Sequence, residues 1–379
     1  MPKPTQANGY GGVLPVGRLH PLVATALGKG DPDAEWRRYL ALLGQETPDE
    51  GERRLYPLAA PHMSEQRLSR AELAPVRAER RTATVRREIL FAAAAQIDDL
   101  LARTGIRPAL LKGLALQIRV YGEGAVRASS DIDLYVDRAD IEQCLGQVEA
   151  AGWVRTEARP RTRDAAFIAS TQTRLTFQMP SGVLVDIHWY PRQVLEFDPQ
   201  RADQFSADLA ARTYRGRQWR IPSDLWLLFE TIEHGMAWNE VTPIRWLVDA
   251  VQLVEQSDAD IDWDRLCRLV EQTHLNLCFA SALSAMRVFT ERVPQSAIDR
   301  LATQRATPLE RLYMRCRLRP PPAPLYGLML SGSHLMLRRP GTWAQRIACW
   351  PVYYRSSALK CLSWGDVAKR AVEKAGGAG

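Results

Sequence analysis

The chain has 379 residues, of which 46% are hydrophobic and 25% are charged, and its net charge is +7. This composition is that of an ordinary soluble protein. No apolar run approaches the ~20 residues of a membrane span, so we expect no membrane-spanning helix. A chain of this length usually exceeds one hydrophobic core, which predicts one principal domain with helical additions or two closely packed domains.

A cytoplasmic location is predicted from the N-terminus and the cysteines. The first twenty residues lack the apolar segment of a secretory signal, and the six cysteines are scattered without a C-x-x-C pair. We therefore expect reduced thiols rather than a disulfide framework or a zinc knuckle.

The positive charge is concentrated near the C-terminus. Residues 301–365 contain ten basic side chains and one acidic side chain, whereas the rest of the chain has 40 basic and 42 acidic residues. Such a segment can attract an anionic partner such as RNA, an acidic peptide or a membrane surface. The alternative is a solvated helical surface that keeps the protein soluble.

The first hundred residues predict mostly helix. Residues 1–33 are rich in Gly and Pro and are expected to be extended, and "AEWRRYLALL" predicts a short helix after them. Neither segment carries a chemical motif. Apolar residues at helical spacing predict a stronger helix over residues 84–103, which Gly105 ends.

The pattern then changes to short strands. "RPALLKG" predicts a buried strand, and "GLALQIRVYGEG" predicts the helix that follows it. "DIDLYV" predicts a second strand, and a helix is expected over residues 138–151. In "RLTFQMPSGVLVDIHWY" a Pro-Ser-Gly turn separates two alternating runs, which is typical of a hairpin.

Two carboxylates lie one residue apart in the second strand. Asp131 and Asp133 share one face of the strand, and apolar side chains share the other. Residues at i and i+2 stand roughly 6.5 Å apart at about 3.3 Å rise per residue, close enough to bind one cation together or to bridge two. Without a cation they would repel each other. An edge strand with its polar face in water would also explain the pair.

The hairpin contributes a third carboxylate. Asp186 and His188 share one face of an otherwise apolar strand. Strand interiors disfavour Asp, so three such residues in two strands predict a compensating partner. Mg²⁺ is favoured because it binds a few carboxylates together with substrate phosphates.

The order of these motifs carries a family resemblance. A Lys-Gly turn between a strand and a helix is followed by Arg-x-x-x-Asp-x-Asp on a second strand and by "VDIHW" on a third. This order resembles the DNA polymerase beta-like nucleotidyltransferase superfamily, and within it a large bacterial branch of poorly characterised nucleotidyltransferase family proteins. The resemblance covers roughly residues 106–191, with a looser match through "LLFETIEHGMAWNEVTPIRWLVDAVQLV".

The resemblance implies a two-metal reaction. In that superfamily, two Asp of one strand and a third Asp from a neighbouring strand hold two divalent metals, Mg²⁺ or Mn²⁺. A nucleoside monophosphate moves from an NTP to an acceptor hydroxyl, and pyrophosphate is released. By this resemblance Asp131 and Asp133 would bind both metals, and Asp186 would bind the catalytic metal and help to deprotonate the acceptor.

The turn before the Asp pair departs from the superfamily pattern. The superfamily usually has Gly-Ser close before the pair, whereas here Lys112-Gly113 precedes Asp131 by eighteen residues. The branch that the chain resembles carries Lys-Gly at this point. Lys112 could reach a phosphate, and Gly113 would let the backbone approach the triphosphate. The alternative for Lys112 is a surface lysine at a strand end.

Four more polar residues are candidate contacts to phosphate. The planar guanidinium group of Arg127 suits the triphosphate. Ser129 and Ser130 could donate hydrogen bonds to it, although a turn at the strand entry explains both serines equally well. His188 could orient a phosphate or the acceptor, or it could be a hydrogen-bonded structural residue.

Helices after Ser223 are expected to form the lid or acceptor side of the site. His234, Arg245 and Asp249 match polar positions in the branch that the chain resembles. Arg245 and Asp249 are four residues apart on one predicted helix, so an intrahelical ion pair is the default interpretation.

Together the elements predict an α+β protein with a small mixed β-sheet nucleotidyltransferase core and helical segments on both sides of it. The expected regions are a partly helical N-terminal extension (residues 1–83), the core (84–215), a helical subdomain (216–300), and a basic C-terminal helical segment (301–379) whose end is disordered.

The acceptor remains open at this point. Members of the branch that the chain resembles are associated with the tailoring of peptide natural products, so a ribosomal peptide is one candidate. A small metabolite, a protein side chain and an RNA end are others. Two further functions are alternatives: a catalytically idle scaffold that binds NTP or peptide, and an RNA-binding protein that acts through residues 301–379. Retention of all three carboxylates favours the enzyme over both.

Overall fold

The structure of this protein is a computed structural model that describes residues 15–156, 172–192, 195–196, 198–237, 241, 243–257, 261–318, 325–355 and 365. Within these residues the chain forms a seven-stranded mixed sheet with helices before, between and after its strands. The predicted α+β class is therefore confirmed.

The sheet has the strand order β3-β4-β5-β2-β1-β7-β6. Its strands are β1 (Ala109–Leu110), β2 (Ile132–Tyr135), β3 (Val154–Arg155), β4 (Arg174–Gln178), β5 (Leu184–His188), β6 (Leu209–Tyr214) and β7 (Arg217–Pro222). β2 pairs with β5 and β1 pairs with β7 in parallel, and the other neighbours are antiparallel. β4 and β5 form the hairpin that the sequence predicted.

The central strands β2 and β5 pack one face into the core. Ile132 and Leu134 of β2 lie beside Val185 and Ile187 of β5, and all four side chains are buried. Because successive side chains of a strand point to opposite faces, the carboxylates of both strands are left on the other face.

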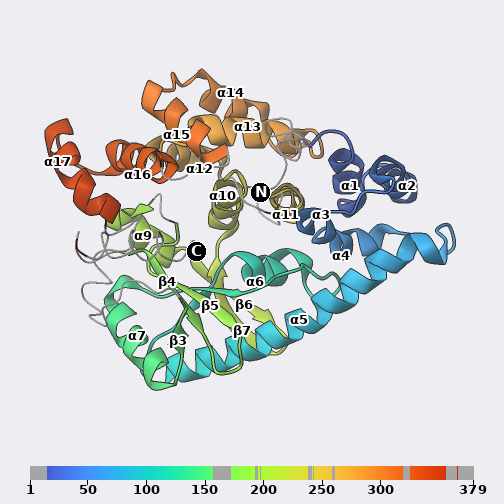
Figure 1. The fold of residues 1–379 in the computed structure, drawn as a ribbon, viewed down its shortest axis with the longest axis horizontal. Coiled ribbons are helices and arrows are strands. Elements are labelled where there is room, and N and C mark those ends of the chain that lie inside the picture. Colours follow the sequence, from blue (N-terminus) through green and yellow to red (C-terminus); the bar gives the residue numbers. More distant parts are fainter. Residues whose placement is uncertain are drawn as a thin grey trace, which may run out of the picture.

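The N-terminal helices lie along and at one end of the sheet. They are α1 (Leu19–Ala26), α2 (Pro32–Leu43), α3 (Glu50–Arg53), α4 (Tyr56–Ala59), the 3-10 turn η2 (Ala60–His62) and α5 (Arg70–Ala102). Figure 1 shows α5 running along the sheet, with α1 to α4 near its first residues. Phe91 of α5 packs on Tyr214 and Trp219, with ring centroids 4.8 and 5.9 Å away, and thereby joins α5 to β6 and β7.

The extended segment predicted for residues 1–33 is wrong in its second half. Residues 19–26 form α1, and Leu22 and Val23 of this helix are fully buried. Residues 1–14 lie outside the described part of the chain, and so does the disordered end that was predicted for the C-terminal segment.

The remaining helices connect the strands and cover the site. Within the sheet region they are α6 (Lys112–Leu116), the π-helical turn η3 (Gln117–Tyr121), the 3-10 turn η4 (Arg138–Asp140), α7 (Ile141–Ala150) and α9 (Pro199–Ala207). After the sheet come α10 (Asp224–Gly235), α11 (Arg245–Glu255), α12 (Trp263–Gln272), α13 (Asn276–Arg287), α14 (Gln295–Thr303), α15 (Pro308–Leu318), α16 (Leu325–Arg338) and α17 (Trp343–Tyr353). In Figure 1, α12 to α15 lie on the side of α10 that faces away from the sheet.

α10 joins the sheet to the C-terminal helices. It packs on α6, α11 and α13, and its last residue, Gly235, lies against Trp246 of α11. One continuous hydrophobic cluster runs from Leu22 to Tyr313 through both the sheet and these helices. This cluster crosses the boundaries at residues 84, 216 and 301 that were expected from the sequence, and the division into four regions stays a prediction. In the described part of the chain, no helix combines the length and the apolar character that crossing a membrane requires.

Part of the basic C-terminal segment is structural. Arg317 is 9% exposed, its NH1 lies 2.7 Å from Oε1 of the buried Glu233, and its guanidinium group lies over the Tyr313 ring. Arg338 donates a hydrogen bond to the Thr273 carbonyl oxygen. Its guanidinium carbon also lies over the Tyr313 ring, 4.3 Å from the ring centroid. These charges hold helices together and are not free for a partner. Arg319 and Lys360 lie outside the described residues.

Candidate active site

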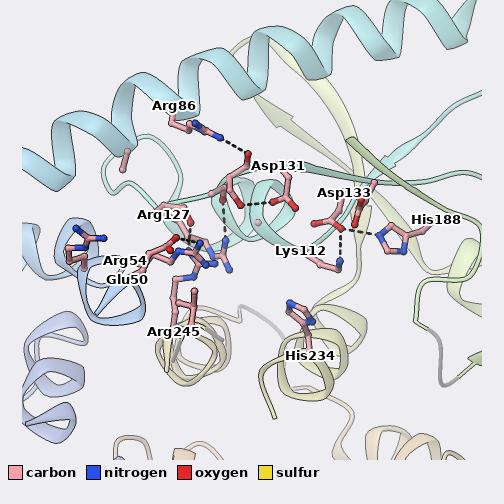
Figure 2. Close-up of a pocket in the computed structure, with 18 of the residues that line it drawn as sticks. Glu50, Arg54, Arg86, Lys112, Arg127, Asp131, Asp133, His188, His234 and Arg245 are labelled. Carbon is pink, nitrogen blue, oxygen red and sulfur yellow. Dashed lines mark hydrogen bonds and ion pairs between the residues drawn. The ribbon is translucent and has the colours of Figure 1, made fainter. Parts of the chain in front are cut away.

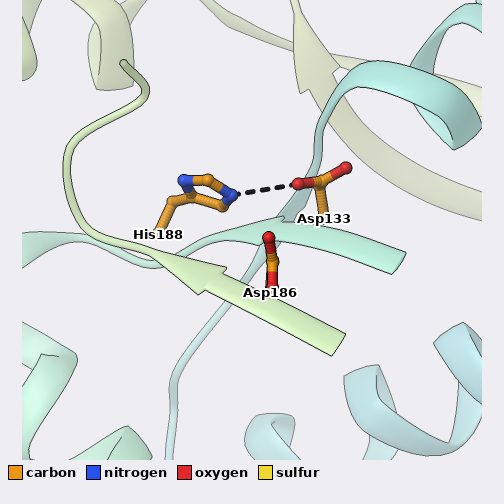
Figure 3. Close-up of side chains that lie close together, drawn as sticks. All are labelled: Asp133, Asp186 and His188. Atoms are coloured by element: carbon orange, nitrogen blue, oxygen red, sulfur yellow. Dashed lines mark hydrogen bonds and ion pairs between the residues drawn. The ribbon is translucent and has the colours of Figure 1, made fainter. Parts of the chain in front are cut away.

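The parallel pairing of β2 and β5 brings two carboxylates and a histidine together. Asp133 lies opposite Asp186, and His188 follows two residues later on the same face. Each of these residues offers one ligand atom, and the three atoms lie within 4.8 Å of one another (Figure 3). Two carboxylate oxygens and one imidazole nitrogen therefore converge in a way that suits a divalent cation.

Asp133 is the most enclosed member of this group, with 6% of its surface exposed. Its Oδ1 accepts a hydrogen bond from Lys112 Nζ at 2.5 Å and lies 3.0 Å from His188 Nε2. Burial acts to raise the pKa of Asp133, but Lys112 and His188 outweigh it and hold that pKa well below its usual range. Burial and the neighbouring Lys112 also lower the pKa of His188, so this ring is neutral and able to bind a metal.

Asp131 lies just before β2 and outside the three-residue group. Its Oδ1 accepts a hydrogen bond from Ser130 Oγ at 3.0 Å, and Figure 2 shows it between Arg127 and Asp133. Burial and the nearby Asp133 raise the pKa of Asp131. Burial is the larger of these two causes, and the contribution of Asp133 corresponds to the repulsion that the sequence predicted. The pKa of Asp133 is not raised in the same way, because Lys112 neutralises that carboxylate.

Asp186 is held by its hairpin partner strand. Arg174 NH1 and Thr176 Oγ1, both from β4, each lie 2.5 Å from one of its carboxylate oxygens. The Arg174 side chain is 42% exposed, so it can move away without opening the core. Asp186 is therefore both positioned by β4 and accessible from the cavity.

The Lys112-Gly113 turn fixes the entry of α6 beneath these carboxylates. Lys112 has φ +45°, a left-handed backbone conformation that costs a non-glycine residue about 1–3 kcal/mol. A Cβ on Gly113 would lie 2.6 Å from Ser129 Oγ and 3.0 Å from Arg127 NH1, so a larger residue there would displace these two side chains. This strained turn places the Lys112 ammonium on Asp133 and brings Ser129 against the turn.

Arg127 is anchored to α11. Its Nε and NH2 donate hydrogen bonds to Asp249 at 2.8–3.1 Å, and Asp249 also accepts one from Tyr121 at 2.7 Å. The remaining nitrogen, NH1, lies 3.2 Å from Ser129 Oγ. Arg127 is therefore buried and paired with Asp249, and only its NH1 faces Ser129.

Arg245 has a different main partner from the one expected. It donates a hydrogen bond to the Ala128 carbonyl oxygen, whereas its Nε is 3.9 Å from Asp249, which is bound more closely by Arg127. Two guanidinium groups thus share one carboxylate. Burial, together with the positive charge of Arg127, lowers the pKa of Arg245 to about 9. An anion at this place would relieve that excess of positive charge.

The nine residues predicted for the site, together with Arg174 and Arg245, line one cavity of about 860 Å³. Its walls carry eight cationic side chains and five carboxylates. Figure 2 shows Arg54, Arg127 and Arg245 toward one end, together with Glu50, and Asp133 and His188 toward the other, together with Lys112. The volume is within the range of small-molecule sites, and Arg54, Arg127 and Arg245 gather at the end away from Asp133 and His188.

Sequence reasoning missed several residues of this cavity. Glu50 lies in α3 and Arg54 directly follows that helix, in a segment that carries no chemical motif. Arg86 of α5 donates a hydrogen bond to the Ser130 carbonyl oxygen at 2.9 Å. These residues reach the cavity through the tertiary packing of the N-terminal helices, which no local sequence pattern predicts. All nine predicted site residues lie together in or beside the cavity, and their individual roles stay predictions.

The comparison with known proteins identifies a family. Residues 32–290 match the model of a family described as uncharacterised nucleotidyltransferase. The match spans α2 to α13 and includes every strand of the sheet. None of the curated proteins with which the chain was compared matches it. The family match covers more than half of the chain and confirms the resemblance seen in the motifs, so this protein belongs to that family of nucleotidyltransferases.

Proposed function

We propose that this nucleotidyltransferase moves a nucleoside monophosphate from an NTP to an acceptor hydroxyl, with a divalent metal held by Asp133, Asp186 and His188. The observation that carries the proposal is the convergence of these three ligand atoms on one wall of a cavity with a cationic far end. Phosphoryl-group transfer needs mainly positioning and neutralisation of charge, and this cavity offers both.

The donor atoms fit Mg²⁺ or Mn²⁺. Two carboxylate oxygens are hard ligands that suit either ion, and the neutral imidazole of His188 is a ligand that Mn²⁺ accepts readily. The raised pKa of Asp131 marks a place where a further positive charge would be favourable. When bound, such a cation neutralises phosphate oxygens and makes an acceptor hydroxyl more acidic.

The cationic end of the cavity is the proposed site of the triphosphate. Arg127 NH1, Ser129 and the Gly113 backbone meet at the entry of α6, and Arg54 and Arg245 extend the positive surface beyond them. Charged guanidinium nitrogens donate strong hydrogen bonds to phosphate oxygens, so these residues would hold the leaving pyrophosphate. The α-phosphate would then face the carboxylates.

Asp186 is proposed to take the proton of the acceptor hydroxyl. Arg174, which contacts Asp186, and Thr173 also line the cavity. An acceptor that enters beside them would attack the α-phosphate from the side opposite the leaving pyrophosphate. We propose a small metabolite, a peptide or a protein side chain as the acceptor. A ribosomal peptide remains one candidate among these.

The first test is calorimetric titration of each NTP into the protein with and without Mg²⁺ or Mn²⁺. We expect one or more nucleotides to bind only with metal, and Asp133→Asn to lose that metal dependence. Asp203→Asn is the matched control, because Asp203 is an exposed carboxylate of α9 outside the cavity. No nucleotide binding to the wild-type protein, or equal binding by Asp133→Asn, would contradict the proposal.

A further inference from the structure

Lys112 lies where the proposed metal needs room. Its Nζ is 2.5 Å from Oδ1 of Asp133, the same oxygen that faces His188 Nε2 at 3.0 Å. A divalent cation on Asp133 would repel an ammonium group at this distance. Metal binding therefore requires the Lys112 side chain to move. Because this side chain is only 18% exposed, the displaced ammonium group needs another partner.

A second cavity lies beside Lys112. It has a volume of about 90 Å³, and Lys112, Arg127, His234 and Arg245 line both this cavity and the larger one. Its other walls come largely from apolar side chains of α6, α10 and α11, among them Leu116, Leu227 and Trp246. This volume is too small for a ligand of the size of benzene, but it is large enough for the end of one side chain and a little water.

Glu230 of α10 lines the second cavity without a partner of its own. It is 2% exposed, and neither of its carboxyl oxygens has a hydrogen-bond partner within the described part of the chain. Burial raises its pKa to about 8, although Arg192 and Lys112 act in the opposite direction. Buried carboxyl groups nearly always have hydrogen-bond partners, so this group points to a partner that arrives in another state of the protein.

We propose that Glu230 is a positioning residue that receives the Lys112 ammonium group when a divalent cation binds Asp133. This inference rests on the proposed metal site. Lys112 already borders both cavities, and its unbranched side chain can turn from one to the other. Glu230 gives up its proton to solvent as the ammonium group arrives, so an ion pair replaces a neutral buried acid.

A phosphate of the NTP is the competing destination for Lys112. The two destinations are separated by using metal alone, because without nucleotide the phosphate destination is absent. Glu230 then remains as a carboxyl group of the second cavity whose oxygens have no hydrogen-bond partner within the described part of the chain. Mn²⁺ is the probe, and its binding is followed by the loss of the electron paramagnetic resonance signal of the free ion.

The experiment compares the wild type, Glu230→Gln, Lys112→Met and the double variant in full-length protein. We expect Glu230→Gln to weaken Mn²⁺ binding by about 5- to 100-fold when Lys112 is present and to change it less than about twofold in the Lys112→Met background. Glu142→Gln, an exposed position of α7, is the matched control. Circular dichroism checks that each variant is folded.

The outcomes separate this inference from the proposed function. Equal Mn²⁺ affinity of the wild type and Glu230→Gln would overturn the role of Glu230 while leaving the metal site intact. Equal weakening in both Lys112 backgrounds would mean that Glu230 acts through water or on the metal itself, which also overturns the inference. No Mn²⁺ binding by the wild type would overturn the metal site and this inference with it.

Discussion

The two carboxylates of the Asp-x-Asp motif have different surroundings, although they look equivalent in the sequence. Asp133 is paired with Lys112 and His188, whereas Asp131 is near Asp133 and has only Ser130 as a hydrogen-bond partner among the contacts described. Removing one member of a buried pair leaves the other without compensation, whereas removing a repelled charge does not. The motif therefore combines one neutralised carboxylate with one that is available to a cation.

This difference predicts opposite effects of the same substitution. In metal-free buffer, Asp133→Asn is expected to lower the free energy of unfolding by about 1–3 kcal/mol, because the Lys112 ammonium group loses its partner. Asp131→Asn is expected to be neutral or stabilising, because it removes repulsion from Asp133. Urea unfolding with a chelator present measures both. Equal destabilisation by the two variants would show that Asp133 is not specially compensated.

The buried Glu230 predicts a dependence of stability on pH. Its pKa is about 8 in the folded protein against 4.5 as the ordinary value, so between these pH values the folded state keeps a proton that the unfolded state has lost. Stability from this group is thus fully present below pH 4.5 and is lost as the pH rises toward 8, by at most roughly 1.4 kcal/mol per pH unit.

Glu230→Gln isolates this effect because glutamine has no proton to lose. Urea unfolding is measured between pH 5 and 8 in the absence of metal. We expect the wild type to lose stability relative to Glu230→Gln as the pH rises across this window. If the difference in free energy of unfolding between the two proteins stayed constant across this pH range, Glu230 would be ionised throughout and paired with another group of the dissolved protein.

The candidate site shows how far local pattern extends. Asp133, Asp186 and His188 could be placed on one face because a strand alternates with period two and because the Pro-Ser-Gly turn defines the hairpin. Glu230 could not be found in this way, because the sequence of its helix is that of an ordinary buried helix. The role proposed for Glu230 also depends on Lys112, which is 118 residues away in the sequence. Arg54, which directly follows α3, reaches the cavity only through the packing of that helix.

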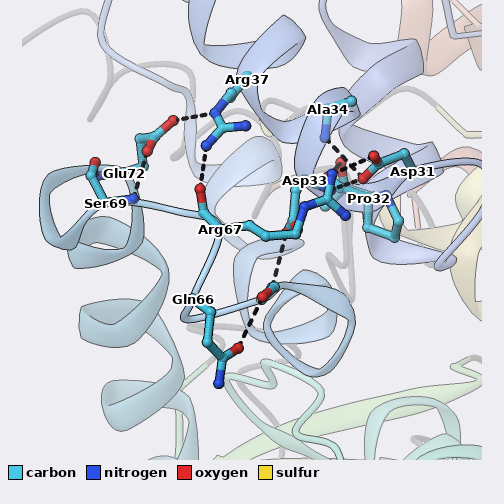
Figure 4. A network of polar contacts seen from close by, with 11 residues as sticks. Asp31, Pro32, Asp33, Ala34, Arg37, Gln66, Arg67, Ser69 and Glu72 are labelled. Atoms are coloured by element: carbon cyan, nitrogen blue, oxygen red, sulfur yellow. Dashed lines mark hydrogen bonds and ion pairs between the residues drawn. The ribbon is translucent and has the colours of Figure 1, made fainter.

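At the scale of elements, the sequence predicted the helices with long apolar periodicity and missed or shortened the others. α5 begins at Arg70, fourteen residues before the predicted start, because Ser69 and Glu72 form a capping box. Figure 4 shows that Arg37 of α2 also binds Glu72, at 2.9 Å. The first turns of α5 are thus fixed by caps and ion pairs, which apolar spacing does not detect.

α1 was missed for a different reason. It has eight residues, and its proline and flanking glycines favour an extended chain in a sequence-based reading. Its burial between α2 and α4 outweighs this weak local preference, since most of the stability of a short helix in a protein comes from tertiary packing.

The contact between α10 and α11 sets the width of the second cavity and predicts a sensitive glycine. A Cβ on Gly235 would lie 2.1 Å from Trp246 Cβ and Cγ, which cannot turn away without moving α11. Gly235→Ala is therefore expected to destabilise the protein by up to about 3 kcal/mol through overpacking.

Gly146→Ala is the matched control for this substitution. Gly146 lies in the middle of α7 with nothing near its would-be Cβ, so alanine there is expected to stabilise the protein by about 0.5–1 kcal/mol. Thermal unfolding of the two variants measures the difference. Similar stability changes for both would show that α10 and α11 are not held at the distance described.

At the scale of the whole molecule, the basic C-terminal segment has two competing explanations. As an RNA-binding surface, its arginines would be exposed and their loss would reduce RNA affinity without affecting the fold. The structure instead places Arg317 between Glu233 of α10 and Tyr313 of its own helix, and Arg192 binds the same carboxylate from the cavity side. The Arg317–Glu233 pair therefore joins the C-terminal helices to the helix that carries Glu230 and His234.

Substitution of two arginines of α15 distinguishes these explanations. Arg317→Met is expected to lower the free energy of unfolding by roughly 2 kcal/mol or more, because the buried Glu233 keeps only Arg192. Arg311→Met, at an exposed position of the same helix, is expected to change it by less than about 0.5 kcal/mol. Urea unfolding measures both, and RNA binding at low and moderate salt is measured alongside. If both variants kept wild-type stability and both lost a steeply salt-dependent affinity for RNA, the segment would be a nucleic-acid surface, because counterion release upon phosphate contact produces that dependence.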